Sequence, residues 1–164
     1  MRRLLLPSLL LSFSVGCGDA GSPAAPTLTP APSPPAASLS IAVRPDPVLA
    51  ADTGDPDAPL RAEWQVRISE GSGVGGRLSF VNATLRDGAS GAEAEPSGVV
   101  SMGAGDIVAQ AGTNRVEPGG SLTVTQALQY DLPSGGRAGI LTVTVQFVDD
   151  AGNLISRSAQ AAVG

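Results

Sequence analysis

The chain has 164 residues, which is enough for one folded domain with a hydrophobic core and hardly enough for two. The chain has 10 basic residues, all arginines, and 15 acidic ones, and the resulting net charge of -5 argues against nucleic-acid binding. The lack of histidine removes the usual proton shuttle and metal ligand, and one cysteine cannot form an internal disulfide. With 21 glycines and 14 prolines, the composition favours short strands joined by turns.

Residues 1–16 are predicted to be a signal peptide. A basic start at Arg2 and Arg3 precedes a mostly apolar run from Leu4 to Val15. This run is about the length of a signal-peptide core and is shorter than the roughly 20 residues that a membrane-spanning helix needs.

The apolar run ends at the cysteine, in the sequence Ser14-Val15-Gly16-Cys17. These residues resemble the lipobox of bacterial lipoproteins, with Ser14 where that family usually has an aliphatic residue. The resemblance implies that Cys17 becomes the N-terminus and that its thiol carries a diacylglyceryl group with palmitate-type chains. Two acyl chains suffice for a stable membrane anchor. We therefore expect a lipid-anchored protein of the bacterial cell envelope. By resemblance to the sorting rules of diderm bacteria, Gly18 in place of the aspartate that retains lipoproteins on the inner membrane implies the outer membrane or cell surface.

An ordinary signal peptidase offers an alternative. It would cut after Ala20, using Gly18 and Ala20 as its small residues, and Cys17 would then be removed with the leader. The product would be a soluble periplasmic or secreted protein.

Residues 17–37 are predicted to be a lipidated cysteine followed by a disordered stalk rich in proline and alanine. Six prolines lie between Pro23 and Pro35, and the segment has almost no apolar bulk with which to form a core. Extended polyproline II at about 3.1 Å per residue would let it hold a domain up to about 60 Å from the membrane. A proline-rich docking ligand is the competing interpretation.

Residues 38–164 show the alternation of apolar and polar side chains that is typical of half-buried strands. The clearest example runs from Leu60 to Ile68, where every second residue is apolar. Between Phe80 and Val81 the parity changes, which predicts either a β-bulge or a strand that passes between two environments. The predicted strands are residues 39–43, 60–68, 77–86, 107–109, 122–130, 141–147 and 154–163.

The predicted turns separate these strands. Glu117-Pro118-Gly119-Gly120 has the proline and glycine positions of a type II turn, and Gly152 is placed for the left-handed conformation of a tight hairpin. About seven strands with no capped helix predict an all-β fold, a single antiparallel two-sheet β-sandwich. On strand spacing, Trp64 in an early strand and the Asp149–Asn153 hairpin, residues 38–164 resemble the immunoglobulin-like and fibronectin-type domains of bacterial envelope proteins.

Two loops are rich in oxygen ligands. Asp46, Asp52, Asp55 and Asp57 lie in one, and Asp149, Asp150 and Asn153 lie in the other. Close carboxylates can hold calcium, so the second loop is a weak metal site candidate, although Asp and Asn are also ordinary turn residues.

The sequence Gly71-Ser72-Gly73-Val74-Gly75-Gly76 contains the GxGxxG spacing of dinucleotide-binding loops. That motif requires a following helix, and residues 77–86 are poor helix formers, so we interpret it as a hairpin loop with no cofactor. Glu63 and Glu70 are the strand-borne candidates for a carboxylate pair, but no aromatic platform for a sugar lies near them in sequence.

These observations favour a non-enzymatic, lipid-anchored envelope protein that acts as a structural, adhesive or protein-interaction module. Cys17 would hold the membrane, and an envelope protein would be the partner. The alternative is a periplasmic protein that binds calcium or another small ligand.

Overall fold

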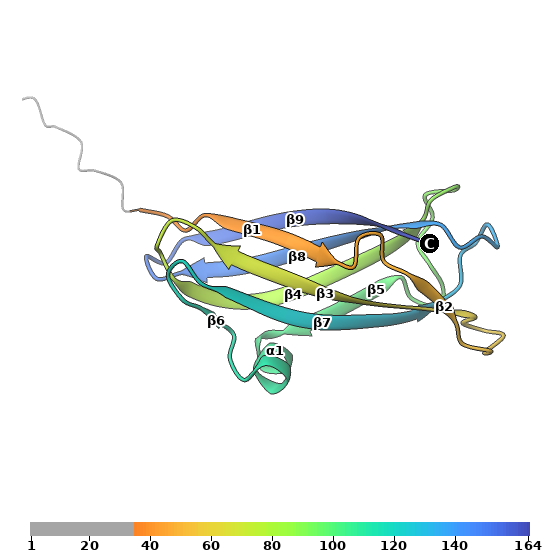
Figure 1. The fold of residues 1–164 in the computed structure, drawn as a ribbon, viewed down its shortest axis with the longest axis horizontal. Helices are drawn as coiled ribbons and strands as arrows, with labels where there is room; N and C mark the ends of the chain where they lie inside the picture. The colour runs from red at the N-terminus through yellow and green to blue at the C-terminus, as the bar shows by residue number, and fades with distance from the viewer. Residues whose placement is uncertain (1–34) are drawn as a thin grey trace, which may run out of the picture. The chain divides into compact units, whose positions relative to one another are not determined.

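The computed structural model describes residues 35–164, which form two antiparallel β-sheets and one short helix (Figure 1). The predicted signal peptide lies outside the described residues, as do Cys17 and most of the predicted stalk. The fold is all-β, as predicted, apart from the helix.

The first sheet is centred on β3 (Leu60–Glu70). One edge of β3 pairs with β1 (Leu39–Arg44) and then with the three-residue β2 (Ala50–Asp52). Its other edge pairs along nearly its whole length with β7 (Ser121–Tyr130). The outward side chains of β1, β3 and β7 therefore lie side by side on the outer face of this sheet.

The second sheet has the strand order β5-β4-β8-β9, with β6 as a short additional partner of β4. Its long strands are β4 (Gly76–Asp87), β8 (Gly139–Asp149) and β9 (Leu154–Val163). Its short strands are β5 (Val99–Gly103) and β6 (Arg115–Val116). The pairing of β4 with β8 shifts register between Leu78 and Phe80, which confirms the predicted bulge.

The core lies between the two sheets and is formed by the inward-facing set of each alternating strand. Burial of this apolar surface is the main stabilising term of the fold. Two consecutive hydrogen bonds link the sheets through the core. The Trp64 indole N–H donates to Gln126 Oε1 at 3.3 Å, and Gln126 Nε2 donates to the Val81 carbonyl at 3.2 Å. The largest fully buried side chains include Trp64, Tyr130, Phe147, Ile68, Leu78, Leu85 and Ile107.

Backbone hydrogen bonds join the two sheets along one side. Between β1 and β2 the chain reaches the end of β9, where the Val48 N–H donates to the Ala162 carbonyl at 2.8 Å. The Gly164 N–H returns a bond of 3.0 Å to the Val48 carbonyl. These bonds satisfy backbone groups that would otherwise form an open sheet edge.

The opposite side carries the free edge of β7, and helix α1 (Ala104–Ala111) contacts this strand. From α1, Gln110 Nε2 donates to the Thr125 carbonyl at 2.8 Å, and Gln110 Oε1 accepts from the Thr125 N–H at 2.7 Å. The side-chain amide thus bonds Thr125 as a neighbouring strand would. This blocks part of an edge that could pair with another chain.

The strand predicted at residues 107–109 is wrong, because these residues belong to α1. The Gly103 N–H donates to Asp106 Oδ2 at 2.9 Å, and Gly112 ends the helix in the left-handed conformation. Ile107 is fully buried, so the helix is held by packing as well as by its ends. The expectation that no capped helix occurs fails for the same reason.

The other six predicted strands are present, and the structure adds the short strands β2, β5 and β6. The turn predictions are confirmed: Gly119 and Gly152 both have positive φ, and the Gly120 N–H donates to the Glu117 carbonyl at 2.8 Å. Within residues 35–164, no helix is long and apolar enough to cross a bilayer.

Candidate functional site

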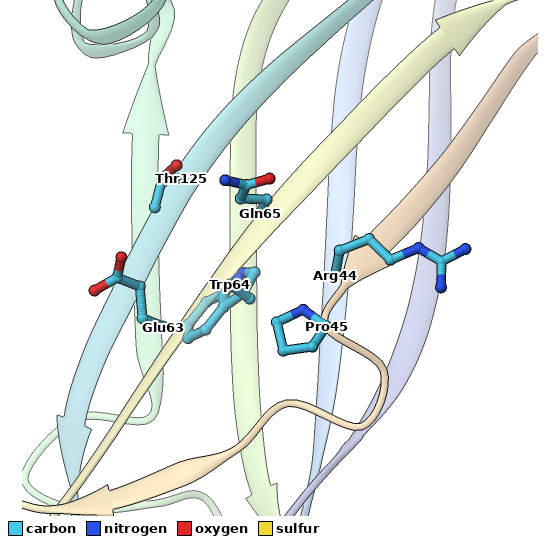
Figure 2. A pocket seen from close by; sticks show the side chains of 6 residues that line it. All are labelled: Arg44, Pro45, Glu63, Trp64, Gln65 and Thr125. Carbon is cyan, nitrogen blue, oxygen red and sulfur yellow. The ribbon is translucent and has the colours of Figure 1, made fainter.

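The outer face of the first sheet contains two adjoining hollows. One, of about 350 Å³, is lined by Arg44, Pro45, Glu63, Trp64, Gln65 and Thr125 (Figure 2). The other, of about 390 Å³, is lined by Ala42, Arg44, Gln65, Arg67, Ser121 and Thr123. Arg44 and Gln65 line both hollows. We call the second one the arginine groove.

The strand register creates the arginine groove. Arg44 of β1 lies opposite Gln65 of β3, and Gln65 lies opposite Thr125 of β7. In the next row, Ala42, Arg67 and Thr123 lie side by side. The two arginines are therefore diagonal neighbours on one face, and residues in such a pairing are about 7–8 Å apart, with a somewhat shorter distance between their Cβ atoms.

Both arginines are exposed, and neither forms an ion pair with a carboxylate of the described residues. Arg67 Nη2 donates to Ser121 Oγ at 3.3 Å. The arginine groove itself has no acidic lining residue, whereas the neighbouring hollow has Glu63, on the side away from Arg44 (Figure 2). Glu63 pairs with Arg61 at 3.2 Å.

The predicted calcium loop at Asp149, Asp150 and Asn153 is occupied by donors of the protein itself. Asp149 accepts from the backbone N–H groups of Ala151 and Asn153 and from Asn153 Nδ2. These contacts, the Asn153 side chain foremost, lower the pKa of the Asp149 carboxyl. Asp150 instead forms a two-bond ion pair with Arg115, which lowers its pKa.

Carboxylates in the other acidic loop also have local partners. Asp52 pairs with Arg137 at 2.8 Å, and Asp55 Oδ1 accepts from the Asp57 N–H at 3.0 Å. No group of three or more acidic or cysteine side chains gathers in a metal-binding arrangement among residues 35–164. Asp149 and Asn153 are in contact with each other, but neither loop gathers three carboxylates among these residues. Cys17, the candidate lipidation site, lies outside the described residues.

The glycine-rich loop that follows β3 encloses a carboxylate of the chain. Glu70 is 3% exposed and accepts from the backbone N–H groups of Ser72, Gly73 and Gly119. The Ser72 hydroxyl adds another bond and is the largest cause of a pKa far below the ordinary value for glutamate. Backbone amides in such loops often bind phosphate, but here Glu70 already takes that place.

Glu70 and Asp149 also hold the point where the chain enters the domain. The Ser38 N–H donates to Glu70 Oε1 at 3.2 Å, and the Ala37 N–H donates to Asp149 Oδ2 at 3.1 Å. Ser72 Oγ, whose proton is directed to Glu70, also lies 3.0 Å from the Ala36 carbonyl oxygen. From sequence, Glu70 was a candidate for catalysis and Asp149 a candidate metal ligand. In the structure, both carboxylates accept hydrogen bonds from backbone N–H groups of the domain.

Sequence reasoning missed the arginine groove. Alternation places Gln65 and Arg67 on the polar side of one strand, but it does not tell which residues of β1 lie beside them. The sequence offered only a general signal, which is that Arg44 and Arg67 lie on or beside predicted strands in a chain of net charge -5.

The solved structures with a similar fold include two that this chain matches over most of their length. The putative ApaA protein from Bordetella pertussis is 18% identical, with a TM-score of 0.55 over 77% of this chain and 92% of that one. The structural-genomics target SoR45 is 14% identical, with a TM-score of 0.56 over 77% and 86% of the two chains. At these identities the likeness extends to the fold alone. No protein-family model and no curated protein matches the sequence. The chain therefore belongs to the all-β class built from two antiparallel sheets.

Proposed function

We propose that this protein is a lipid-anchored protein of the bacterial cell envelope whose immunoglobulin-like or fibronectin-type domain binds another envelope protein without catalysing a reaction. The strand orders β1/β2-β3-β7 and β5-β4-β8-β9 support an immunoglobulin-like topology. In such sandwiches the chain likewise places its first strands in one sheet, crosses to the second sheet, returns to the first and ends in the second. The anchor would be Cys17, on the outer membrane or cell surface.

One observation carries the interaction role. The chain enters the domain at Ala37 and Ser38, which are bound by Asp149 and Glu70, and the outer face of the first sheet remains an open polar surface with the arginine groove. Such a surface, held by a rigid sheet, suits recognition of a partner. The carboxylates that sequence analysis considered for chemistry are instead engaged by amides or arginine.

The anchor is tested on protein purified from cell membranes. Mass spectrometry of the mature N-terminus should find Cys17 as the first residue with two or three acyl chains. The matched control is Cys17→Ser, which should remain unacylated and leave the membrane fraction. A mature N-terminus beyond Cys17, without acyl chains, would contradict the anchored role and support the soluble exported alternative.

The interaction role is tested by cross-linking in intact cells, followed by identification of the captured protein. We expect the same envelope protein to be captured at equal yield in repeat experiments. Capture should be lost when the domain is unfolded. Thermal unfolding with added calcium addresses the ligand-binding alternative. We expect no rise in Tm, because Asp149 and Asp150 already have protein partners; a rise that saturates with calcium would favour the alternative.

A further inference from the structure

We propose that the arginine groove binds an extended acidic peptide segment of the partner, with two carboxylates on alternate residues. This inference rests on the proposed interaction function and names the chemistry of the partner. It places one carboxylate on Arg44 and the other on Arg67.

Charge complementarity selects an anionic ligand. The chain has a net charge of -5, yet the arginine groove contains two arginines and no carboxylate. Among the described residues, Arg61, Arg115 and Arg137 are paired with acidic residues, whereas Arg77, Arg86 and Arg157 form no ion pair, like the two groove arginines. What distinguishes Arg44 and Arg67 is that they line the same hollow. Arg44 and Arg67 therefore keep guanidinium groups available for a ligand. A guanidinium matches a carboxylate in planar, two-bond geometry.

Spacing selects an extended peptide. Arg44 and Arg67 are diagonal neighbours across β1 and β3, an arrangement that places residues about 7–8 Å apart, with a somewhat shorter distance between their Cβ atoms. In an extended chain, side chains on alternate residues point the same way and recur every 6.6–6.8 Å or so. An acidic residue, any residue and a second acidic residue thus match the two arginines. Carboxylates three residues apart would point to opposite faces of the strand.

The remaining lining is suited to a peptide backbone. Gln65, Ser121 and Thr123 present amide and hydroxyl groups that can donate to and accept from main-chain groups. No aromatic side chain lines the arginine groove, so it lacks the stacking platform on which sugar binding commonly relies. An anionic membrane is also a poorer fit, because recruitment to it usually takes a cluster of 4–8 or so basic residues.

The test measures fluorescence anisotropy of labelled peptides with the purified full chain. The peptides have the same length and carry Glu-Thr-Glu, Gln-Thr-Gln or Glu-Thr-Thr-Glu in a threonine-rich background. Binding of the first is expected, with at least a fivefold weaker Kd for the other two and weakening as salt is raised. Arg44→Gln and Arg67→Gln should each weaken binding by about three- to fivefold, in the range of exposed ion pairs.

Arg157→Gln is the matched control, because Arg157 is an exposed arginine on β9, outside the groove. It should bind the Glu-Thr-Glu peptide as the unchanged chain does. Circular dichroism of all three variants checks that the fold is retained, which is expected because these side chains are exposed.

Four results would overturn the inference: no binding of the Glu-Thr-Glu peptide, equal binding of the Gln-Thr-Gln peptide, equal losses in Arg157→Gln, or arginine-dependent binding to anionic phosphatidylglycerol vesicles in place of the peptide. The last would assign the arginine groove to lipid. Failure of the proposed function is distinguished by cross-linking. If the Arg44→Gln, Arg67→Gln double variant still captures the same envelope protein, the interaction role holds and the groove is not its site.

Discussion

Replacing Tyr130 by phenylalanine should stabilise the protein. Tyr130 at the end of β7 is fully buried, and its hydroxyl is a buried polar atom without a hydrogen-bond partner in the described structure. Leaving such a group unpaired costs about 1–3 kcal/mol, and Tyr130→Phe removes it while keeping the ring. We expect a gain of about 1–2 kcal/mol, or a rise in Tm of roughly 3–10 °C.

Thermal unfolding followed by circular dichroism measures this gain, and Trp64→Phe is the control. Trp64 is equally buried, but its indole N–H is bonded to Gln126, so this change both breaks a hydrogen bond and leaves a cavity. It should lower stability by about 2 kcal/mol. A fall in Tm for Tyr130→Phe would refute the reasoning, because it would mean that the hydroxyl has a partner in solution.

A spectroscopic titration gives a second check on the same residue. Burial raises the pKa of the Tyr130 hydroxyl, against the opposing charge of Arg137. Tyr130 is the only tyrosine in the chain, so ultraviolet absorbance of the phenolate reports on it directly. Phenolate formation at the ordinary pKa of about 10 in the folded protein would show that the hydroxyl is hydrated.

Two further changes test the buried carboxylate and the protected edge. Donors to Glu70 lower its pKa in the folded state, so its contribution to stability is complete above pH about 4.5 and is lost as pH falls through the lowered pKa. Glu70→Gln should therefore lower Tm at pH 7 and flatten the fall in Tm at acid pH; an unchanged acid profile would contradict this. Gln110→Ala removes both hydrogen bonds to the backbone of Thr125 and exposes that part of the β7 edge. Light scattering should then detect self-association that rises with protein concentration. Gln110→Glu keeps an acceptor for the Thr125 N–H and should associate less. A monomeric Gln110→Ala variant would show that α1 protects β7 without this side chain.

The sequence by itself determined the class of fold and most long strands, because alternation is a local property of the chain. Trp64 and its alternate neighbours had to share one face, whatever lay opposite. Positive φ at Gly119 and Gly152 was predictable for the same reason, since a turn is specified by its own four residues.

Residues 104–111 show where local reasoning failed. The run around Ile107 is too short to separate a strand from a helix by periodicity. Contacts to β4, β5 and β7 decided the matter, because they bury Ile107 and place Gln110 against the edge of β7. Propensity in so short a segment is easily outweighed by packing.

Only the tertiary structure decided what the polar residues do. Glu70 lies at the edge of a loop in the sequence-based interpretation, and the structure shows that the loops after β3 and before β7 close over it and supply its amide donors. Arg44 and Arg67 are 23 positions apart and become neighbours through the register of β1 on β3. Register depends on how two distant segments bury their apolar faces together, and a single strand carries no record of its partner.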